Sequence, residues 1–336
     1  MSPMIKEVAY RAKGESVVSV SSTGAPRVVG YSIAAGVVPS ARRRHGSAEG
    51  LIAVLVVSGF FALLTVGYQL SWVIAQSEGT PAAFVSGLAL SIVLALTPLP
   101  VMFAAVVALD RQRPRPWIRL AFVFGWGAGI AAFFSVALES WVSADLQLYF
   151  GVDATTAETV SGVMLAPPVE EAFKGAALVG LLCQCRRAIG SLTDGVVYAS
   201  VAGLGFATME NILYYLIPIV REGAEEGLAF AAVRGPMMLF MHPLWTSLFG
   251  LGASYALMSR GRVRWPALSL GYAGAALLHF LWNHTIDTAP APSGVVAWLA
   301  GMGKVYLLEL VVVGALIGVT VRERRRRAAA TWSGPG

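Results

Sequence analysis

Residues 51–76 read LIAVLVVSGFFALLTVGYQLSWVIAQ, a stretch without a single acidic or basic side chain. At about 1.5 Å per helical residue, such a run is long enough to cross a hydrocarbon layer about 30 Å thick. Further long apolar runs follow it, at residues 82–109, 117–138, 159–182, 195–217, 228–258, 265–286 and 295–321. The pattern predicts an all-α polytopic membrane protein with about eight transmembrane helices.

The composition supports this class and excludes others. Of the 336 residues, 56% are hydrophobic and 13% are charged, whereas soluble domains are about 25% charged. Transmembrane β-strands alternate in polarity over about ten residues, but these runs are continuous and longer. The net charge of +6 does not form one basic stripe, so we expect no nucleic-acid partner. The C-x-C of Cys183 and Cys185 is too weak a signal to predict a disulfide or a metal site.

The arginines predict the topology. With eight spans and a cytoplasmic N-terminus, the segments on the inside contain seventeen arginines, and the segments outside contain one, Arg221. Cytoplasmic loops carry the excess of basic residues, so both termini are predicted to be cytoplasmic. The seventeen are Arg42, Arg43, Arg44, Arg111, Arg113, Arg115, Arg119, Arg186, Arg187, Arg260, Arg262, Arg264, Arg322, Arg324, Arg325, Arg326 and Arg327.

The same pattern divides the chain into three parts. Residues 1–49 are rich in Gly and Ser and are predicted to form a flexible cytoplasmic tail. Residues 50–321 form the transmembrane domain, and residues 322–336 form a basic cytoplasmic tail. We expect a multi-pass integral membrane protein, with anionic lipid at its cytoplasmic arginine clusters.

Ionisable residues inside four consecutive apolar runs point to a function. Such residues are costly in a membrane, and by default they mark a functional site. The runs contain APPVEEAFKGAALVGLL with Glu170, Glu171 and Lys174; GLGFATMENILYYL with Glu210 and Asn211; RGPMMLFMHPLW with Arg234 and His242; and LLHFLWNHTID with His279, Asn283 and His284.

Counting along each run places these groups at a common depth. We expect one helix to begin near Pro167 and another near Pro236, because proline suits a first helical turn. Glu170, Glu210, His242 and His279 then lie roughly 5–12 Å below the outer boundary. A shared site explains one polar layer across four helices better than unrelated placements do.

The residue types suit hydrolysis. Lys174 lies between Glu170 and Glu171 on its helix face and can neutralise one carboxylate while the other acts as a base. Two histidines and a carboxylate from three helices can bind a tetrahedral divalent metal with an open water position. A further Glu could accept the proton of that water, and an Asn amide could stabilise an oxyanion.

These residues also resemble a known family. E-E-x-x-K at Glu170–Lys174, F-x-x-x-E-N at Phe206–Asn211 and H-x-x-x-N at His279–Asn283 are similar to the motifs of PrsW-type intramembrane metalloproteases. That family is related to the CAAX prenyl endopeptidases and bacteriocin-immunity-type membrane proteases. The resemblance covers roughly residues 165–287, the predicted catalytic helices.

The resemblance implies proteolysis of a membrane-anchored, typically regulatory protein near the outer face. It implies catalytic roles for Glu170, Glu171, Lys174 and Asn283. It implies that Glu210, His242 and His279 bind a divalent metal, with zinc as the first expectation, or organise water. Which Glu of the pair is the base stays open, as does a metal-free mechanism in which a Glu–His pair activates water.

Other interpretations are possible at the level of sequence. Any one membrane histidine can serve as a helix–helix hydrogen-bond partner, and Arg234 can pair with a carboxylate or reach the headgroups. A proton-coupled transporter with a Glu/His relay is the main alternative function. Transporters are expected to show two related halves, whereas these polar residues concentrate in one half of the chain.

Overall fold

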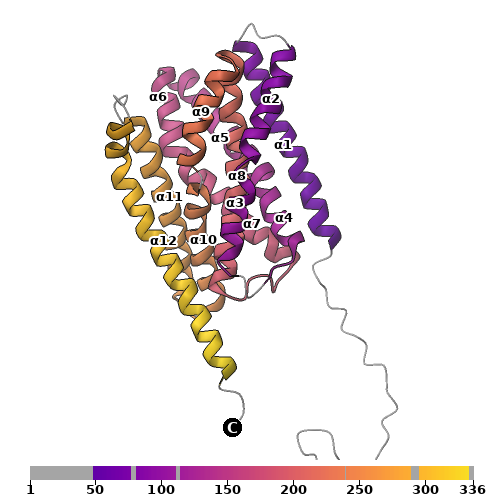
Figure 1. Cartoon of the computed structure of the whole chain (residues 1–336), viewed down its shortest axis with the longest axis vertical. Coiled ribbons are helices and arrows are strands. Elements are labelled where there is room, and N and C mark those ends of the chain that lie inside the picture. Colours follow the sequence, from indigo (N-terminus) through magenta and orange to yellow (C-terminus); the bar gives the residue numbers. More distant parts are fainter. Residues whose placement is uncertain (1–47, 77–80, 111–113, 239, 289–294, 333–336) are drawn as a thin grey trace, which may run out of the picture. The chain divides into compact units, whose positions relative to one another are not determined.

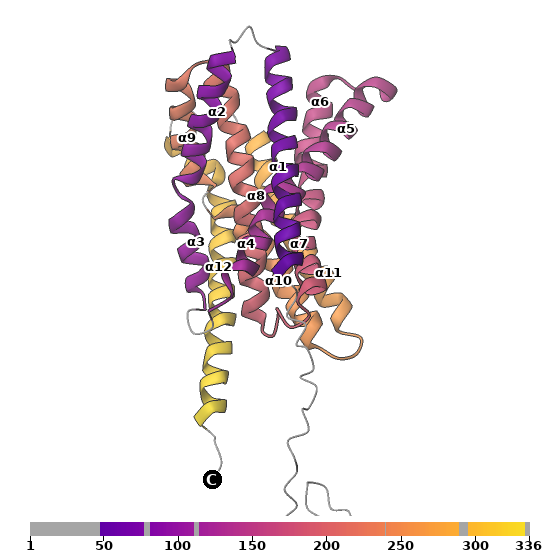
Figure 2. The same cartoon turned by 90° about the vertical axis from the view of Figure 1, so that its right-hand side faces the viewer.

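The computed structural model describes residues 48–76, 81–110, 114–238, 240–288 and 295–332. Within these ranges all regular structure is helical, which confirms the all-α class. The elements are α1 (Ala48–Gln76), α2 (Pro81–Leu96), α3 (Leu99–Ala108), α4 (Trp117–Gly125), the π-helix η1 (Trp126–Ala131), α5 (Ala132–Phe150), α6 (Ala154–Thr159), the π-helix η2 (Val160–Leu165), α7 (Ala166–Gln184), α8 (Leu192–Arg221), α9 (Ala224–Met237), α10 (Met241–Met258), α11 (Arg264–Thr288) and α12 (Val295–Trp332). Figures 1 and 2 show the long helices running side by side.

The described part of each predicted apolar run is mostly helical, and several runs contain more than one element; the run at residues 228–258, for example, contains most of α9 and all of α10. Five helices of the described part are long and apolar enough to cross a membrane. The stretches containing α7, α10 and α11 do not meet that criterion. The count of eight spans and the orientation therefore stay predictions, and the proposed tail lies outside the described residues up to residue 47.

The prediction that a helix begins near Pro167 needs correction. The chain is already helical from Ala154, passes through η2 and continues as α7. Proline lacks an N–H and its ring crowds the carbonyl of the preceding turn, and the wider π-helical turn lies directly before Pro167 and Pro168. The two glutamates that follow therefore do not face a free helix N-terminus.

The helix expected to begin at Pro236 is also different. Pro236 lies in the last turn of α9, and a new helix, α10, begins at Met241. Pro243 explains the break, because a proline is tolerated in a first helical turn but not in a helix interior. His242 consequently lies in the first turn of α10 rather than deep within a helix.

α8 lies at the centre of the described helices. Its most apolar stretch is 94% buried, against 17% for α1. Glycines allow its neighbours to come close: a methyl group on Gly203 would lie 2.6 Å from the carbonyl oxygen of His242, and one on Gly205 would collide with the carbonyl oxygen of Phe124. These two glycines therefore allow close helix packing around α8.

Polar contacts tie three segments together at one end of the helices. Arg115 donates to Asp194 over 2.8 Å, and Arg327 contacts Asp110 over 3.3 Å. The carboxylate of Glu323 accepts the backbone N–H groups of Leu192 and Thr193 and so caps α8. These segments are among those that the sequence assigns to the cytoplasmic side.

We predict that Gly203→Ala destabilises the protein. The added methyl would force α8 and α10 apart at His242, which costs about 1–3 kcal/mol for overpacking. The thermal unfolding midpoint in detergent should fall. Gly314→Ala on α12 is the matched control, because nothing lies within 4 Å of a methyl there. Equal midpoints for both variants would contradict the close packing.

Candidate functional site

Five helices bring the predicted polar residues into one cluster. α7 carries Glu170, Glu171 and Lys174, α8 carries Glu210, and α9 carries Arg234. The two histidines come from α10 and α11, so His242 and His279 meet although they are far apart in sequence. The ring centroids of the histidines are 5.2 Å apart.

The Lys174 ammonium lies at the centre of the cluster. It donates to Glu170 Oε2 over 2.9 Å and to Glu171 Oε1 over 2.8 Å, as the sequence spacing predicted. A third bond goes to His242 Nδ1 over 2.9 Å. The ammonium also lies 4.0 Å from the ring centroid of Phe206, which favours a cation there. Lys174 is fully buried.

Glu171 is held in one orientation by its neighbours. It is fully buried, and its Oε2 accepts the hydroxyl of Thr246 over 2.8 Å. Its Oε1, which accepts from Lys174, also lies 3.3 Å from His279 Nδ1. His279 Nδ1 is buried and, despite this close contact, has no hydrogen-bond partner among the described residues.

Glu210 and Arg234 fix the second histidine. Glu210 Oε2 accepts from Arg234 Nη2 over 2.9 Å and lies 2.9 Å from His242 Nε2. Because an ammonium can only donate, His242 Nδ1 is the acceptor toward Lys174, and Nε2–H donates to Glu210. Arg234 also donates to Asn211 Oδ1 over 3.2 Å. Its predicted pairing with a carboxylate is confirmed.

Glu170, His242 and His279 form a group that could hold a metal ion. One ligand atom from each lies within 4.8 Å of the others, and all three residues are buried. A carboxylate with two imidazoles is a donor set that suits a divalent cation such as zinc. His279 faces this group through Nε2, which lies 3.8 Å from Glu170 Oε2. The group contains Glu170, whereas Glu210 is the carboxylate that the resemblance implies as a metal ligand.

Asn283 has a different environment from the cluster. Its Nδ2 donates to the carbonyl oxygen of Gly162 over 2.9 Å. In a π-helix that carbonyl would pair with the nitrogen of Pro167, which has no hydrogen. Asn283 therefore satisfies a carbonyl that the proline leaves free, and this contact was not foreseen from the sequence.

A cavity of about 970 Å³ opens onto one side of the cluster. Glu170, Glu210, Arg234 and Asn283 line it, together with aromatic side chains such as Trp282. Lys174, Glu171 and the two histidines are not among its lining residues. The cluster thus presents two carboxylates to the cavity and keeps its ammonium behind them.

Sequence reasoning missed the residues that support the cluster. Trp245 stacks on His279 with ring centroids 4.2 Å apart, and its indole N–H donates to Glu309 Oε1 over 3.1 Å. The hydroxyl of the next residue, Thr246, donates a hydrogen bond to Glu171. A lone Trp or Thr in an apolar run does not mark a functional site. Glu309, which is buried in α12, is an ionisable residue in an apolar run and could have been predicted to belong to the site.

Comparison with known proteins agrees with these motifs. The family described as PrsW family intramembrane metalloprotease matches residues 115–328. The protease PrsW of Bacillus subtilis is 37% identical over 119 residues, which cover 33% of this chain and 50% of the relative. The chain thus spans about half the length of that curated relative. No solved structure matches the chain.

We predict that Thr246→Val lowers stability. The substitution removes the donor to a fully buried carboxylate oxygen, and an unsatisfied buried acceptor costs about 1–3 kcal/mol. Thermal unfolding in detergent measures the change, and Thr246→Ser should restore the wild-type midpoint. Thr285→Val is the control, because that hydroxyl bonds only to the carbonyl of Leu281 in its own helix. The role of Thr246 is refuted if both valine variants unfold alike.

Proposed function

Since the chain belongs to the PrsW family of intramembrane metalloproteases, we propose that it hydrolyses a peptide bond of a membrane-anchored protein. The observation that carries the proposal is the group of Glu170, His242 and His279 beside a cavity. The family and the apolar helices indicate a multi-pass bacterial membrane protein. A Glu/His relay for a transporter would require a path through the protein, whereas these groups converge on one point.

In this proposal Glu170, His242 and His279 hold a divalent ion, zinc in the first instance. A bound divalent ion would acidify a water molecule and polarise the scissile carbonyl. Glu210 orients His242 through Nε2, and Glu171 lies against the Nδ1 side of His279. Carboxylates on the far side of metal-binding imidazoles are a common means of orienting them.

The remaining residues bind, orient and move protons. Glu210 lines the cavity and is paired with Arg234, so its carboxylate is placed to accept a proton from the attacking water. Glu171, enclosed by Lys174 and Thr246, positions its neighbours and does not meet the substrate. Asn283 lies on the cavity wall and binds the substrate backbone. One N–H of its amide donates to the carbonyl of Gly162, and the second N–H can donate to the substrate.

The substrate is a membrane-anchored regulatory protein, and the bond is cut in the outer half of the membrane. The arginine distribution supports this orientation, because Arg115 and Arg327 gather at one end of the helices through Asp110. Glu139, Glu158 and Asp287 line the cavity as well and belong to the segments assigned to the outside. The cavity therefore opens away from the basic end.

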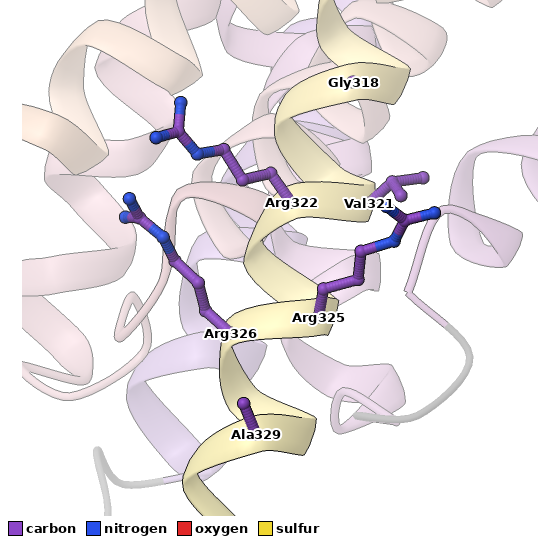
Figure 3. A pocket seen from close by; sticks show the side chains of 6 residues that line it. All are labelled: Gly318, Val321, Arg322, Arg325, Arg326 and Ala329. Atoms are coloured by element: carbon purple, nitrogen blue, oxygen red, sulfur yellow. The ribbon is translucent and has the colours of Figure 1, made fainter.

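We also propose that anionic lipid binds the basic end of α12. Arg322, Arg325 and Arg326 line a shallow pocket of about 390 Å³ (Figure 3). Arg324 and Arg327 instead contact protein, at the carbonyl of Ala108 and at Asp110. The helix thus uses one face for the protein and presents the other three guanidinium groups to phosphate headgroups.

Substitution of the glutamate pair tests the protease proposal. We expect Glu170→Gln and Glu171→Gln each to reduce cleavage of a membrane-anchored substrate by a factor on the order of 10² or more. Cleavage is followed in proteoliposomes with candidate anchored proteins. Glu225→Gln, in the exposed first turn of α9, should cleave at the wild-type rate.

Undiminished cleavage in both Gln variants would overturn the assignment. The same assay separates the metal mechanism from the metal-free one. A chelator should abolish cleavage by the wild type, and zinc should restore it. Full activity in chelator would exclude the metal-dependent mechanism but leave the proposed roles of the two glutamates intact.

The lipid proposal has its own test. The triple variant Arg322→Gln, Arg325→Gln, Arg326→Gln should lose most of the anionic phospholipid that co-purifies with the wild type, as measured by mass spectrometry. The corresponding triple Lys variant retains the positive charge and should retain lipid, although lysine lacks the bidentate hydrogen-bonding geometry of arginine toward phosphate. Equal lipid content in the Gln variant and the wild type would contradict the site. Displacement of the lipid by free inorganic phosphate would show that the pocket recognises phosphate rather than the membrane.

A further inference from the structure

The Lys174 ammonium is hydrogen-bonded to atoms that a metal ion would need as ligands. Two of its three hydrogen bonds go to Glu170 Oε2 and His242 Nδ1. Both residues belong to the group that could hold a divalent ion. His242 Nδ1 is also the ring nitrogen within 4.0 Å of Glu170 Oε2, so it is the nitrogen that faces the shared site.

An imidazole nitrogen has one lone pair. The lone pair of His242 Nδ1 already accepts from Lys174, and Nε2–H is committed to Glu210. A divalent ion therefore cannot bind this histidine while the ammonium keeps its place. Binding through Nε2 instead would break the contact with Glu210, which also holds Arg234.

The charges in the cluster lead to the same conclusion. Three carboxylates, of Glu170, Glu171 and Glu210, lie against the cations of Lys174 and Arg234. Without Lys174 the two carboxylates of α7 would be buried with no cation beside them, which is strongly destabilising. The ammonium thus supplies the charge that a bound ion would otherwise supply.

We propose that the Lys174 ammonium and a divalent metal ion bind the same ligand atoms, Glu170 Oε2 and His242 Nδ1, in turn. In the metal-free protein Lys174 fills the site and keeps it folded; on metal binding it gives up Glu170 and His242 and retains Glu171. This inference rests on the proposed metal site of the protease. It makes Lys174 a built-in competitor that lowers metal affinity and ties activity to the metal supply.

Zinc affinity tests the exchange. Full-length protein in detergent is stripped with chelator and titrated with zinc against a coloured competitor. Lys174→Met should bind zinc more tightly than the wild type, by a factor on the order of ten or more, because no ammonium then occupies Glu170 Oε2 and His242 Nδ1. Lys304→Met makes the same change at an exposed lysine on α12 and should bind as the wild type does.

A second variant separates occupancy from charge and guards against misfolding. Glu171→Gln/Lys174→Met has the same net charge as the wild type, leaves no unpaired buried carboxylate at position 171, and keeps all three proposed ligands. It should still bind zinc more tightly than the wild type. If only Lys174→Met bound zinc more tightly, the gain in affinity would be an effect of charge, and the explanation by shared ligand atoms would be overturned.

Thermal unfolding gives a readout independent of affinity. Chelator should leave the wild-type midpoint nearly unchanged, because the ammonium returns to the site, but should lower the midpoint of Lys174→Met. Equal or weaker zinc binding in the Lys174 variants, or no zinc binding in any protein, would overturn the proposal. These outcomes differ from failure of the protease proposal, which is decided by cleavage in the glutamine variants.

Discussion

The ion pairs of Lys174 with Glu170 and Glu171 are the constraint on which the rest of the site depends. Each bond is within 2.9 Å, and the lysine is entirely buried. A charge in such a place has a large desolvation cost unless every donor is satisfied. The third bond to His242 and the aromatic face of Phe206 complete that requirement. Three helices are thereby fixed around one ammonium.

Helix irregularities place the other members of the cluster. The break between α9 and α10 puts His242 in a first helical turn, where its carbonyl oxygen lies against Gly203 of α8. The π-helix η2 precedes Pro167 and leaves a carbonyl that Asn283 satisfies. In a membrane such irregular backbone is tolerated only where it is buried in protein or lines a cavity. The site therefore lies where the helices are least regular.

The sequence predicted which residues meet but not how they divide the work. Ionisable residues are costly in a membrane, so the positions of Glu170, Glu171, Lys174, Glu210, His242 and His279 inside apolar runs were enough to single them out. Helical spacing also predicted the Lys174 bonds to its two glutamates.

What could not be predicted depends on contacts between distant segments. Glu210 pairs with Arg234 and contacts His242 at Nε2, on the side of the ring away from Glu170. The support of Glu171 by Thr246 and the stacking of Trp245 on His279 have no pattern in the sequence. Helix starts were also misplaced at Pro167 and Pro236, because proline marks either a first turn or a distortion within a longer helix.

X-ray absorption at the zinc edge of the zinc-loaded protein would identify the atoms that bind the ion. We expect nitrogen and oxygen ligands at about 2.0 Å with the outer scattering of two imidazole rings. In His279→Ala the scattering should fall to that of one ring. A sulfur shell at about 2.3 Å, which would point to Cys183 and Cys185, or an unchanged spectrum in His279→Ala, would contradict a site made of Glu170, His242 and His279.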